Sequence, residues 1–207
     1  MPKASHRVEL LEGSVVKHFA DPEAYFRELG VYELGLEMTP RLMDFREPEW
    51  IRLERVYGLP YLDCPLDTCT VGLLARTIAS FHLSTRNGQD CLCHWDNQPR
   101  NILFGNGRFH FVDFSDSRLA KPEDDLTHLL LFWAGEFSAD RMETLAEVFV
   151  AAYQDIQPLH EYQWQNSLAD SILRFDQRRA LHQRAAQHVA GELRDTNRGL
   201  IAGLLAG

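Results

Sequence analysis

Three side chains in the middle of the chain have the types and the spacing needed to bind a divalent cation. Asp96 and Asn101 lie five residues apart in a stretch that begins at His94, and Asp113 follows twelve residues after Asn101. Hard cations such as Mg²⁺ prefer oxygen ligands and typically use one or two carboxylates together with substrate phosphates. Asn101 and Asp113 are therefore the predicted ligands of a Mg²⁺ ion.

The remaining side chain of this set, Asp96, is then available for a different task. It can orient a hydroxyl group that attacks a phosphoryl group, and it can accept the proton of that hydroxyl. Phosphoryl transfer requires this division of labour, because its catalysis consists mainly of positioning and charge neutralisation. The three residues together predict a phosphotransferase in which Asp96 is the base.

A loop followed by a β-hairpin is expected to hold these residues. Residues 101–104 and 108–113 flank the turn Gly105-Asn106-Gly107, which is a strong hairpin signal. Other strands are expected in 7–19, 41–45 and 50–57, and helices in 22–35, 67–84, 122–134, 138–155 and 162–188, with a short terminal helix after them. Strands thus precede helices without βαβ alternation, so the predicted fold class is α+β.

The segment Gly58-Leu59-Pro60 reads as a connector between the strand-rich and the helical parts. We therefore expect a small β-rich lobe with one helix in residues 1–60. A helical lobe in residues 61–207 would carry the predicted catalytic loop and the metal motif.

The central motif, H-x-D-x-x-P-x-N-I-L over residues 94–103 followed by Phe111-Val112-Asp113-Phe114-Ser115, resembles the catalytic loop and metal motif of the protein-kinase-like superfamily. It is closest to the compact branch of aminoglycoside and choline phosphotransferases, lipopolysaccharide-core kinases and RIO-type kinases. The resemblance covers about residues 7–155. It implies a bilobal protein-kinase-like fold with a reduced first lobe, and ATP with Mg²⁺ as cofactors.

Residues before and after the motif fall where this superfamily places further site residues. Lys17 resembles the strand lysine that holds the α- and β-phosphates of ATP, and Glu28 resembles the helix glutamate that pairs with it. Glu33 is a rival for that pairing. Asp125 resembles the aspartate that supports the loops, and His94 is expected to hold the catalytic loop by hydrogen bonds.

The chain also departs from the pattern of this superfamily. No G-x-G-x-x-G loop precedes Lys17, and Ser115 replaces the glycine of the D-F-G motif. Trp95 stands where the compact kinases usually have glycine. Gln98 occupies the position of a basic residue, for which Arg100 is a candidate substitute.

The leading functional prediction is transfer of the γ-phosphoryl group of ATP to a hydroxyl of a small molecule or sugar. The P-x-N-I-L loop and the absence of a long segment between Asp113 and Asp125 favour it. A protein serine/threonine kinase, for which the acceptor is a protein, is the near alternative. A pseudokinase that serves as a nucleotide-binding regulatory module is the second alternative, because the glycine loop is missing.

A third alternative is an iron site of two histidines and one carboxylate. It would combine His94 and Asp96 with His128 or His160. Such a site belongs on the strands of a β-barrel, whereas His128 falls in a predicted helix.

One predicted helix near the C-terminus carries four arginines: Arg174, Arg178, Arg179 and Arg184. The simpler interpretation is a solvated helix face whose arginines pair with Asp170 and Asp176. The alternative interpretation is a contact for an anionic substrate.

Composition limits the remaining possibilities. The 207 residues are 45% hydrophobic and 25% charged, and 30 acidic against 21 basic residues give a net charge of −9. That charge makes nucleic acid an unexpected partner. The four cysteines form no C-x-x-C pair and are expected to be reduced thiols. With neither an apolar leader nor a stretch long enough to span a bilayer, a cytoplasmic protein without a membrane span is expected.

Overall fold

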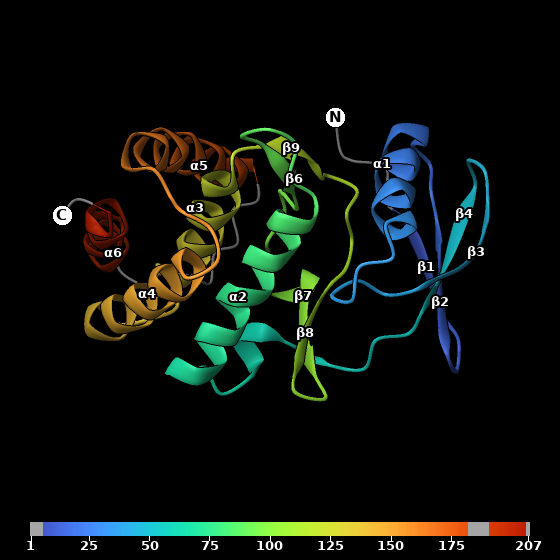
Figure 1. Cartoon of the computed structure of the whole chain (residues 1–207), viewed down its shortest axis with the longest axis horizontal. Helices are drawn as coiled ribbons and strands as arrows, with labels where there is room; N and C mark the ends of the chain where they lie inside the picture. The colour runs from blue at the N-terminus through green and yellow to red at the C-terminus, as the bar shows by residue number, and fades with distance from the viewer. Residues whose placement is uncertain (1–5, 182–190, 206–207) are drawn as a thin grey trace. The chain divides into compact units, whose positions relative to one another are not determined.

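The computed structural model describes residues 6–181 and 191–205, and the side chains of 6–176 and 194–205. In this part of the chain, small sheets accompany six α-helices, which confirms the predicted α+β class (Figure 1). The chain divides into two compact units. The first comprises Met1–Cys64 with Pro99–Arg118, and the second comprises Pro65–Gln98 with Leu119–Gly207. Residues 99–118 thus group with the first unit, and the division into lobes 1–60 and 61–207 stays a proposal.

The first unit contains a four-stranded antiparallel sheet in the order β1-β2-β4-β3. Its strands are β1 (Arg7–Leu10), β2 (Ser14–His18), β3 (Leu42–Arg46) and β4 (Trp50–Glu54). Lys17 is opposite Ile51 and Val15 is opposite Leu53 in the pairing of β2 with β4. Because directly opposed residues point to the same face of a sheet, Lys17 shares its face with the buried Ile51 and Leu53.

Helix α1 (Pro22–Glu33) contacts strand β4. Its N-cap is Asp21, whose side chain accepts a hydrogen bond from the backbone N–H of Glu23 at 3.0 Å, and proline occupies the first turn. Residues at helical spacing along one side are buried, namely Tyr25, Glu28, Leu29 and Tyr32. The buried side of α1 therefore carries a carboxylate within an otherwise apolar and aromatic stripe.

The predicted hairpin forms from β7 (Ile102–Gly105) and β8 (Arg108–Phe111). The predicted connector is itself a two-residue strand, β5 (Leu59–Pro60), which pairs with β7. A Cβ atom at Gly105 would lie 2.0 Å from the carbonyl oxygen of Tyr57, and one at Gly58 would lie 2.8 Å from that of Phe104. Two glycines thus allow the two backbones to approach, which fixes the hairpin against the segment after β4.

The second unit is mainly helical. Its helices are α2 (Thr68–Ser84), α3 (Pro122–Trp133), α4 (Ala139–Gln154), α5 (Glu161–Leu181) and α6 (Gly191–Gly203). Asp67 caps α2 by accepting a hydrogen bond from the N–H of Thr70 at 2.7 Å. Helix α2 packs on α4, and α3 packs on α5 (Figure 1). The fully buried Trp133, Phe149 and Trp164 belong to this helical core.

Most predicted elements are present with ends shifted by a few residues. Besides β5, which was expected as a connector, two short strands were not predicted. These strands, β6 (Cys91–Cys93) and β9 (Arg118–Ala120), pair with each other. Each has only three residues, too few for an alternating pattern to be recognised. The helix expected over 162–188 runs to Leu181, and residues 182–190 lie outside the described residues. No described helix is long and apolar enough to cross a membrane.

Candidate active site

Lys17 lies at the centre of a buried ionic cluster in the first unit. Its Nζ donates to Glu28 Oε2 at 2.6 Å and to Asp113 Oδ1 at 2.6 Å. Strand β2 supplies the lysine, helix α1 supplies Glu28, and the residues after β8 supply Asp113. Glu33 is not the partner of Lys17 in this arrangement. The structure therefore brings together three of the residues singled out from the sequence.

Two hydroxyl groups complete the cluster. Ser115 Oγ accepts a hydrogen bond from Lys17 Nζ at 2.9 Å and lies 2.9 Å from Glu28 Oε2 and 2.8 Å from Asp113 Oδ1. A serine hydroxyl has a single proton, so at any moment it donates to one of these two carboxylates. The hydroxyl of Tyr32 donates to Glu28 Oε1 at 3.1 Å and accepts from the backbone N–H of Asp113 at 3.3 Å.

The charges of this cluster are unequal, because one ammonium group faces two carboxylates. Burial raises the pKa of Glu28, Lys17 opposes that shift, and the charge of Asp113 adds to it. Burial together with the Glu28 charge raises the pKa of the Tyr32 hydroxyl well above its usual value. The side chain of Glu28 is 1% exposed, whereas that of Asp113 is 39% exposed. Asp113 is therefore the carboxylate of the pair that solvent or a metal ion can reach.

Asn101 is held beside the same segment. It ends a 3₁₀ turn, η2 (Pro99–Asn101), is buried, and accepts a hydrogen bond through its carbonyl oxygen from the N–H of Val112 at 3.0 Å. Asp113 follows Val112 directly and adopts a left-handed backbone conformation with φ 67°. The two predicted metal ligands are thus tied to each other through one backbone hydrogen bond of the first unit.

In the second unit, Asp125 organises the predicted catalytic loop. Its carboxylate accepts hydrogen bonds from the backbone N–H groups of His94 at 2.6 Å and Trp95 at 2.8 Å. Its backbone carbonyl accepts a bond from Asn97 Nδ2 at 3.0 Å. Because Asp125 is in the first turn of α3, the helix fixes the loop through a single residue.

A buried histidine extends this network. His82 of α2 makes a hydrogen bond through Nε2 to Asp125 Oδ2 at 3.1 Å and another through Nδ1 to the hydroxyl of Tyr153 at 2.8 Å. Burial of Asp125 favours its neutral form, but the His82 hydrogen bond and the nearby histidines outweigh this, so the pKa of Asp125 is lowered. Asp125 is therefore a carboxylate at neutral pH.

Asp96 lies in the loop that Asp125 supports and is 8% exposed. Gln98 Nε2 donates to Asp96 Oδ2 at 2.6 Å, and the backbone N–H of Asp96 points to His94 Nδ1 at 3.4 Å. The preceding residue, Trp95, has φ 66°. The loop thus presents a carboxylate whose position is fixed by a neighbouring amide and by a strained backbone.

Comparison with family models shows a match to the phosphotransferase enzyme family (APH) over residues 7–164. The match covers most of the chain and includes the Lys17 cluster and the loop supported by Asp125. The chain belongs to this family. It is a kinase-like phosphotransferase, as predicted from its motifs. Comparison with curated proteins gave no match.

Solved structures of similar fold cover nearly the whole chain. Choline kinase LicA from Streptococcus pneumoniae aligns with a TM-score of 0.58 and 15% identity over 98% of this chain and 90% of that chain. An aminoglycoside phosphotransferase from Alicyclobacillus acidocaldarius aligns with a TM-score of 0.65 and 14% identity over 96% and 91%. The streptomycin–ATP–APH(2″)-IIa ternary complex aligns with a TM-score of 0.55 and 15% identity over 84% and 83%. At these identities the likeness establishes the protein-kinase-like fold.

Several residues of this phosphotransferase had no role assigned from sequence. His82 and Tyr153 are 71 residues apart and meet only through the packing of α2 on α4. The sequence identifies Ser115 only as a replacement for the glycine of the D-F-G motif, and it predicts no role for Asn97. No local pattern marks such residues, since their roles depend on partners distant in sequence. Arg100 is exposed.

In the described part of the chain, one group of histidine, cysteine or acidic side chains lies close enough together to hold a metal ion, namely His82 with Cys91 and Cys93. Both ring nitrogens of His82 already make hydrogen bonds, and a hydrogen bond with Cys91 together with burial raises the pKa of Cys93 well above its usual value. A thiol with a raised pKa and an imidazole that is already hydrogen-bonded do not suit a metal ion. Within the described residues, His94 and Asp96 form no such group with His128 or His160, so the iron-site alternative is wrong.

The four cysteines are free, and three of them, Cys64, Cys91 and Cys93, are buried, whereas Cys69 is exposed. Cys91 and Cys93 lie on the same side of strand β6, with sulfur atoms 3.8 Å apart. The expectation of reduced thiols agrees with this arrangement.

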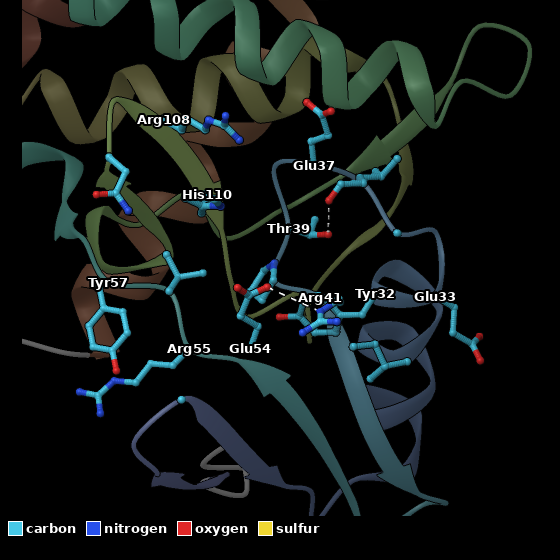
Figure 2. A pocket seen from close by; sticks show the side chains of 17 residues that line it. Tyr32, Glu33, Glu37, Thr39, Arg41, Glu54, Arg55, Tyr57, Arg108 and His110 are labelled. Carbon is cyan, nitrogen blue, oxygen red and sulfur yellow. Dashed lines mark hydrogen bonds and ion pairs between the residues drawn. The ribbon is translucent and has the colours of Figure 1, made fainter.

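The first unit also contains a cavity of about 1110 Å³ (Figure 2). It is lined by the segment after α1, the end of β4 and the β7–β8 turn, and Tyr32 is the one cluster residue in its wall. Figure 2 shows Arg41 beside Glu54, with which it forms an ion pair at 3.9 Å, and His110 facing the interior. Acidic and basic side chains are mixed around this space.

Proposed function

We propose that this phosphotransferase moves the γ-phosphoryl group of ATP to a hydroxyl of a small molecule or sugar. Asp96 is the base, and Asn101 and Asp113 are the protein ligands of Mg²⁺. The observation that carries the proposal is the cluster in which Lys17 contacts both Glu28 and Asp113, with Asn101 tied to the same segment. A cation, an accessible carboxylate and an amide oxygen are the groups that a metal-bound nucleotide requires.

Lys17 is the proposed ligand of the ATP phosphates, and Glu28 is its orienting partner. Glu28 is buried and holds the ammonium group from the α1 side, while Ser115 and Asp113 contact it from the other side. A phosphate oxygen would compete with Asp113 for the ammonium protons, which would release the Asp113 carboxylate toward the metal ion. When bound, Mg²⁺ would neutralise charge on the phosphates.

Two features support Asp96 as the base. Its loop is fixed by Asp125 through the two N–H groups that precede it in the chain, at His94 and Trp95. In addition, Gln98 donates to one carboxylate oxygen, which orients the group without supplying a competing charge. A general base needs such positioning before any adjustment of its pKa becomes relevant.

The similar structures support ATP as the donor and a small molecule as the acceptor. They are a choline kinase, an aminoglycoside phosphotransferase and a ternary complex of such an enzyme with streptomycin and ATP. A protein kinase remains the near alternative and would show autophosphorylation or labelling of a peptide. A pseudokinase is favoured by the missing glycine loop, and it would retain its function when Asp96 is replaced.

The decisive test compares Asp96→Asn with Asp113→Asn in assays of nucleotide binding and of ATP turnover with a panel of hydroxylated metabolites. We expect both variants to lose turnover by 10²-fold or more. Asp96→Asn should still bind Mg-ATP, whereas Asp113→Asn should bind it weakly. Glu147→Gln, an equivalent change at an exposed position of α4, is the matched control and should leave both activities intact. Unchanged turnover in Asp96→Asn would reject the assignment of the base.

A further inference from the structure

Trp95 has a backbone conformation that is unusual for a large side chain. Its φ of 66° lies in the left-handed region, which glycine enters without strain and which a bulky residue adopts at a cost. The compact kinases that this loop resembles usually have glycine here. A strained residue persists only when its surroundings hold it, and such residues concentrate at functional sites. The indole of Trp95 therefore needs an explanation beyond packing.

The indole ring is covered by an arginine from α5. The Cζ atom of Arg174 lies 4.0 Å from the centroid of the Trp95 ring, which is a close cation–π contact. The guanidinium is held by Ser171, whose Oγ accepts from Nη2 at 2.9 Å, and by the carbonyl oxygen of Asp170, which accepts from Nε at 3.3 Å. The indole thus holds a guanidinium on the catalytic loop, one residue before the proposed base, Asp96, in the chain.

The Arg174 side chain is positively charged at every physiological pH, because a guanidinium does not lose its proton in proteins. On α3, Asp124 interacts electrostatically with Arg174, and burial raises the pKa of the Asp124 carboxyl. Elsewhere on α5, Asp176 forms its ion pair with Arg198 of α6 at 2.6 Å. The hydrogen bond from Arg174 to Asp170 is accepted by the backbone carbonyl oxygen of Asp170. Arg178, Arg179 and Arg184 lie outside the residues whose side chains are described.

We propose that Trp95 and Arg174 select acceptors that carry a phosphate or carboxylate group near the reacting hydroxyl. The inference rests on the proposed function, since it takes Asp96 as the base. Arginine binds phosphate and carboxylate through pairs of parallel hydrogen bonds, and its charge attracts them. A cationic head group would instead meet an indole whose face is already covered by a cation, so acceptors such as choline are disfavoured.

Binding titrations on the full chain test this inference with four defined probes. Glucose 6-phosphate and gluconate are the anionic probes, glucose is the neutral one, and choline is the cationic one. Each is titrated calorimetrically into the wild type, Arg174→Gln, Arg174→Lys and Trp95→Phe, with and without Mg²⁺ and a non-hydrolysable ATP analogue. The two anionic probes separate a phosphate requirement from a carboxylate requirement. Thermal unfolding of each variant checks that it is folded.

We expect the wild type to bind at least one anionic probe at least tenfold more tightly than glucose, and choline more weakly than glucose. Arg174→Gln should lose the preference for the anion, Arg174→Lys should retain part of it because the charge remains, and Trp95→Phe should weaken it. The inference is overturned if neither anionic probe binds, if choline binds most tightly, or if Arg174→Gln binds all four probes as the wild type does.

The outcome is distinguishable from a failure of the proposed function. If the ATP analogue does not bind, the proposed phosphotransfer fails, yet the titrations without nucleotide still show whether Arg174 decides anion binding. If the analogue binds and Arg174→Gln leaves the probe affinities unchanged, the acceptor inference fails and the proposed function stands.

Discussion

At the scale of single residues, the cluster around Lys17 contains more negative than positive charge. Lys17 and Glu28 are both buried, so their pairing compensates a large desolvation cost. Lys17→Met keeps the volume of the side chain and removes its charge, which leaves Glu28 without its cation. We expect a loss of about 3–5 kcal/mol in the free energy of unfolding at pH 7, measured by urea denaturation.

The double variant Lys17→Met/Glu28→Gln controls for this effect. Replacing both members of the buried pair leaves only the part-exposed Asp113 carboxylate without its cation, so the double variant should be more stable than Lys17→Met alone. In the single variant, the deficit should shrink as the pH is lowered toward the ordinary Glu pKa, because protonation neutralises Glu28. Additive losses in the double variant would show that the two side chains are not energetically coupled.

Asp125 gives a second prediction at the residue scale. Asp125→Asn retains one acceptor oxygen, but its amide donor must replace either Oδ1, which faces the N–H of Trp95, or Oδ2, which faces His82 Nε2 and the N–H of His94. Each lost bond leaves a buried donor unsatisfied, so we expect a loss of about 3 kcal/mol in unfolding free energy at pH 7. Turnover should also fall, because the loop that carries Asp96 loses its support.

The pH dependence of the Asp125→Asn deficit follows from the lowered pKa of Asp125. A carboxylate with a lowered pKa contributes its full stability above the ordinary value of 3.8, and this contribution is lost as the pH falls toward the folded-state pKa. The difference between wild type and Asp125→Asn should therefore be constant from about pH 5 to 8 and shrink only below about pH 4. If this stability difference already disappears between pH 6 and 7, its cause is the charge of a histidine and not the carboxylate of Asp125.

At the scale of secondary structure, the sequence was most informative where a pattern is local. The capping residues Asp21 and Asp67 and the turn Gly105-Asn106-Gly107 each mark an element within a few residues, and the corresponding helices and hairpin form. Strands β6 and β9 were missed because their pairing joins segments far apart in the sequence. Local signals therefore predict elements, while pairing between distant elements depends on the packed core.

Two glycines in different elements provide a matched test of the close approach between β7 and the segment that follows β4. Gly105→Ala places a Cβ 2.0 Å from the carbonyl oxygen of Tyr57, whereas Gly30→Ala, within helix α1, meets nothing within 4 Å. We expect Gly105→Ala to destabilise the fold by about 2–3 kcal/mol and Gly30→Ala to stabilise it by about 0.5–1 kcal/mol. Thermal unfolding measures both, and equal effects of the two changes would contradict this account.

At the scale of the whole molecule, the sequence predicted the family because one contiguous motif carries it. Residues 94–103 and the strand that ends at Asp113 are close enough in sequence for their spacing to be diagnostic, and the family match over 7–164 confirms the interpretation. The supports of the site were not predictable in the same way. His82 and Tyr153 become partners only when α2 and α4 pack, and the stacking of Arg174 on Trp95 requires α5 beside the loop. The net charge of −9 still makes nucleic acid an unexpected partner.

Stabilisation of the whole chain by its proposed cofactor provides the last prediction. A ligand that binds only the folded state adds about 2.7 kcal/mol at one hundred times its Kd. For a chain of this length, 1 kcal/mol raises the Tm by about 2–4 °C, so saturating Mg-ATP should raise it by about 5–10 °C. Chelation of Mg²⁺ should remove most of the shift, because the proposed metal ligands then hold no cation. Asp113→Asn should abolish the Mg²⁺-dependent part while Asp96→Asn retains it. An equal shift with and without Mg²⁺ would contradict the assignment of Asn101 and Asp113 and would favour the pseudokinase alternative.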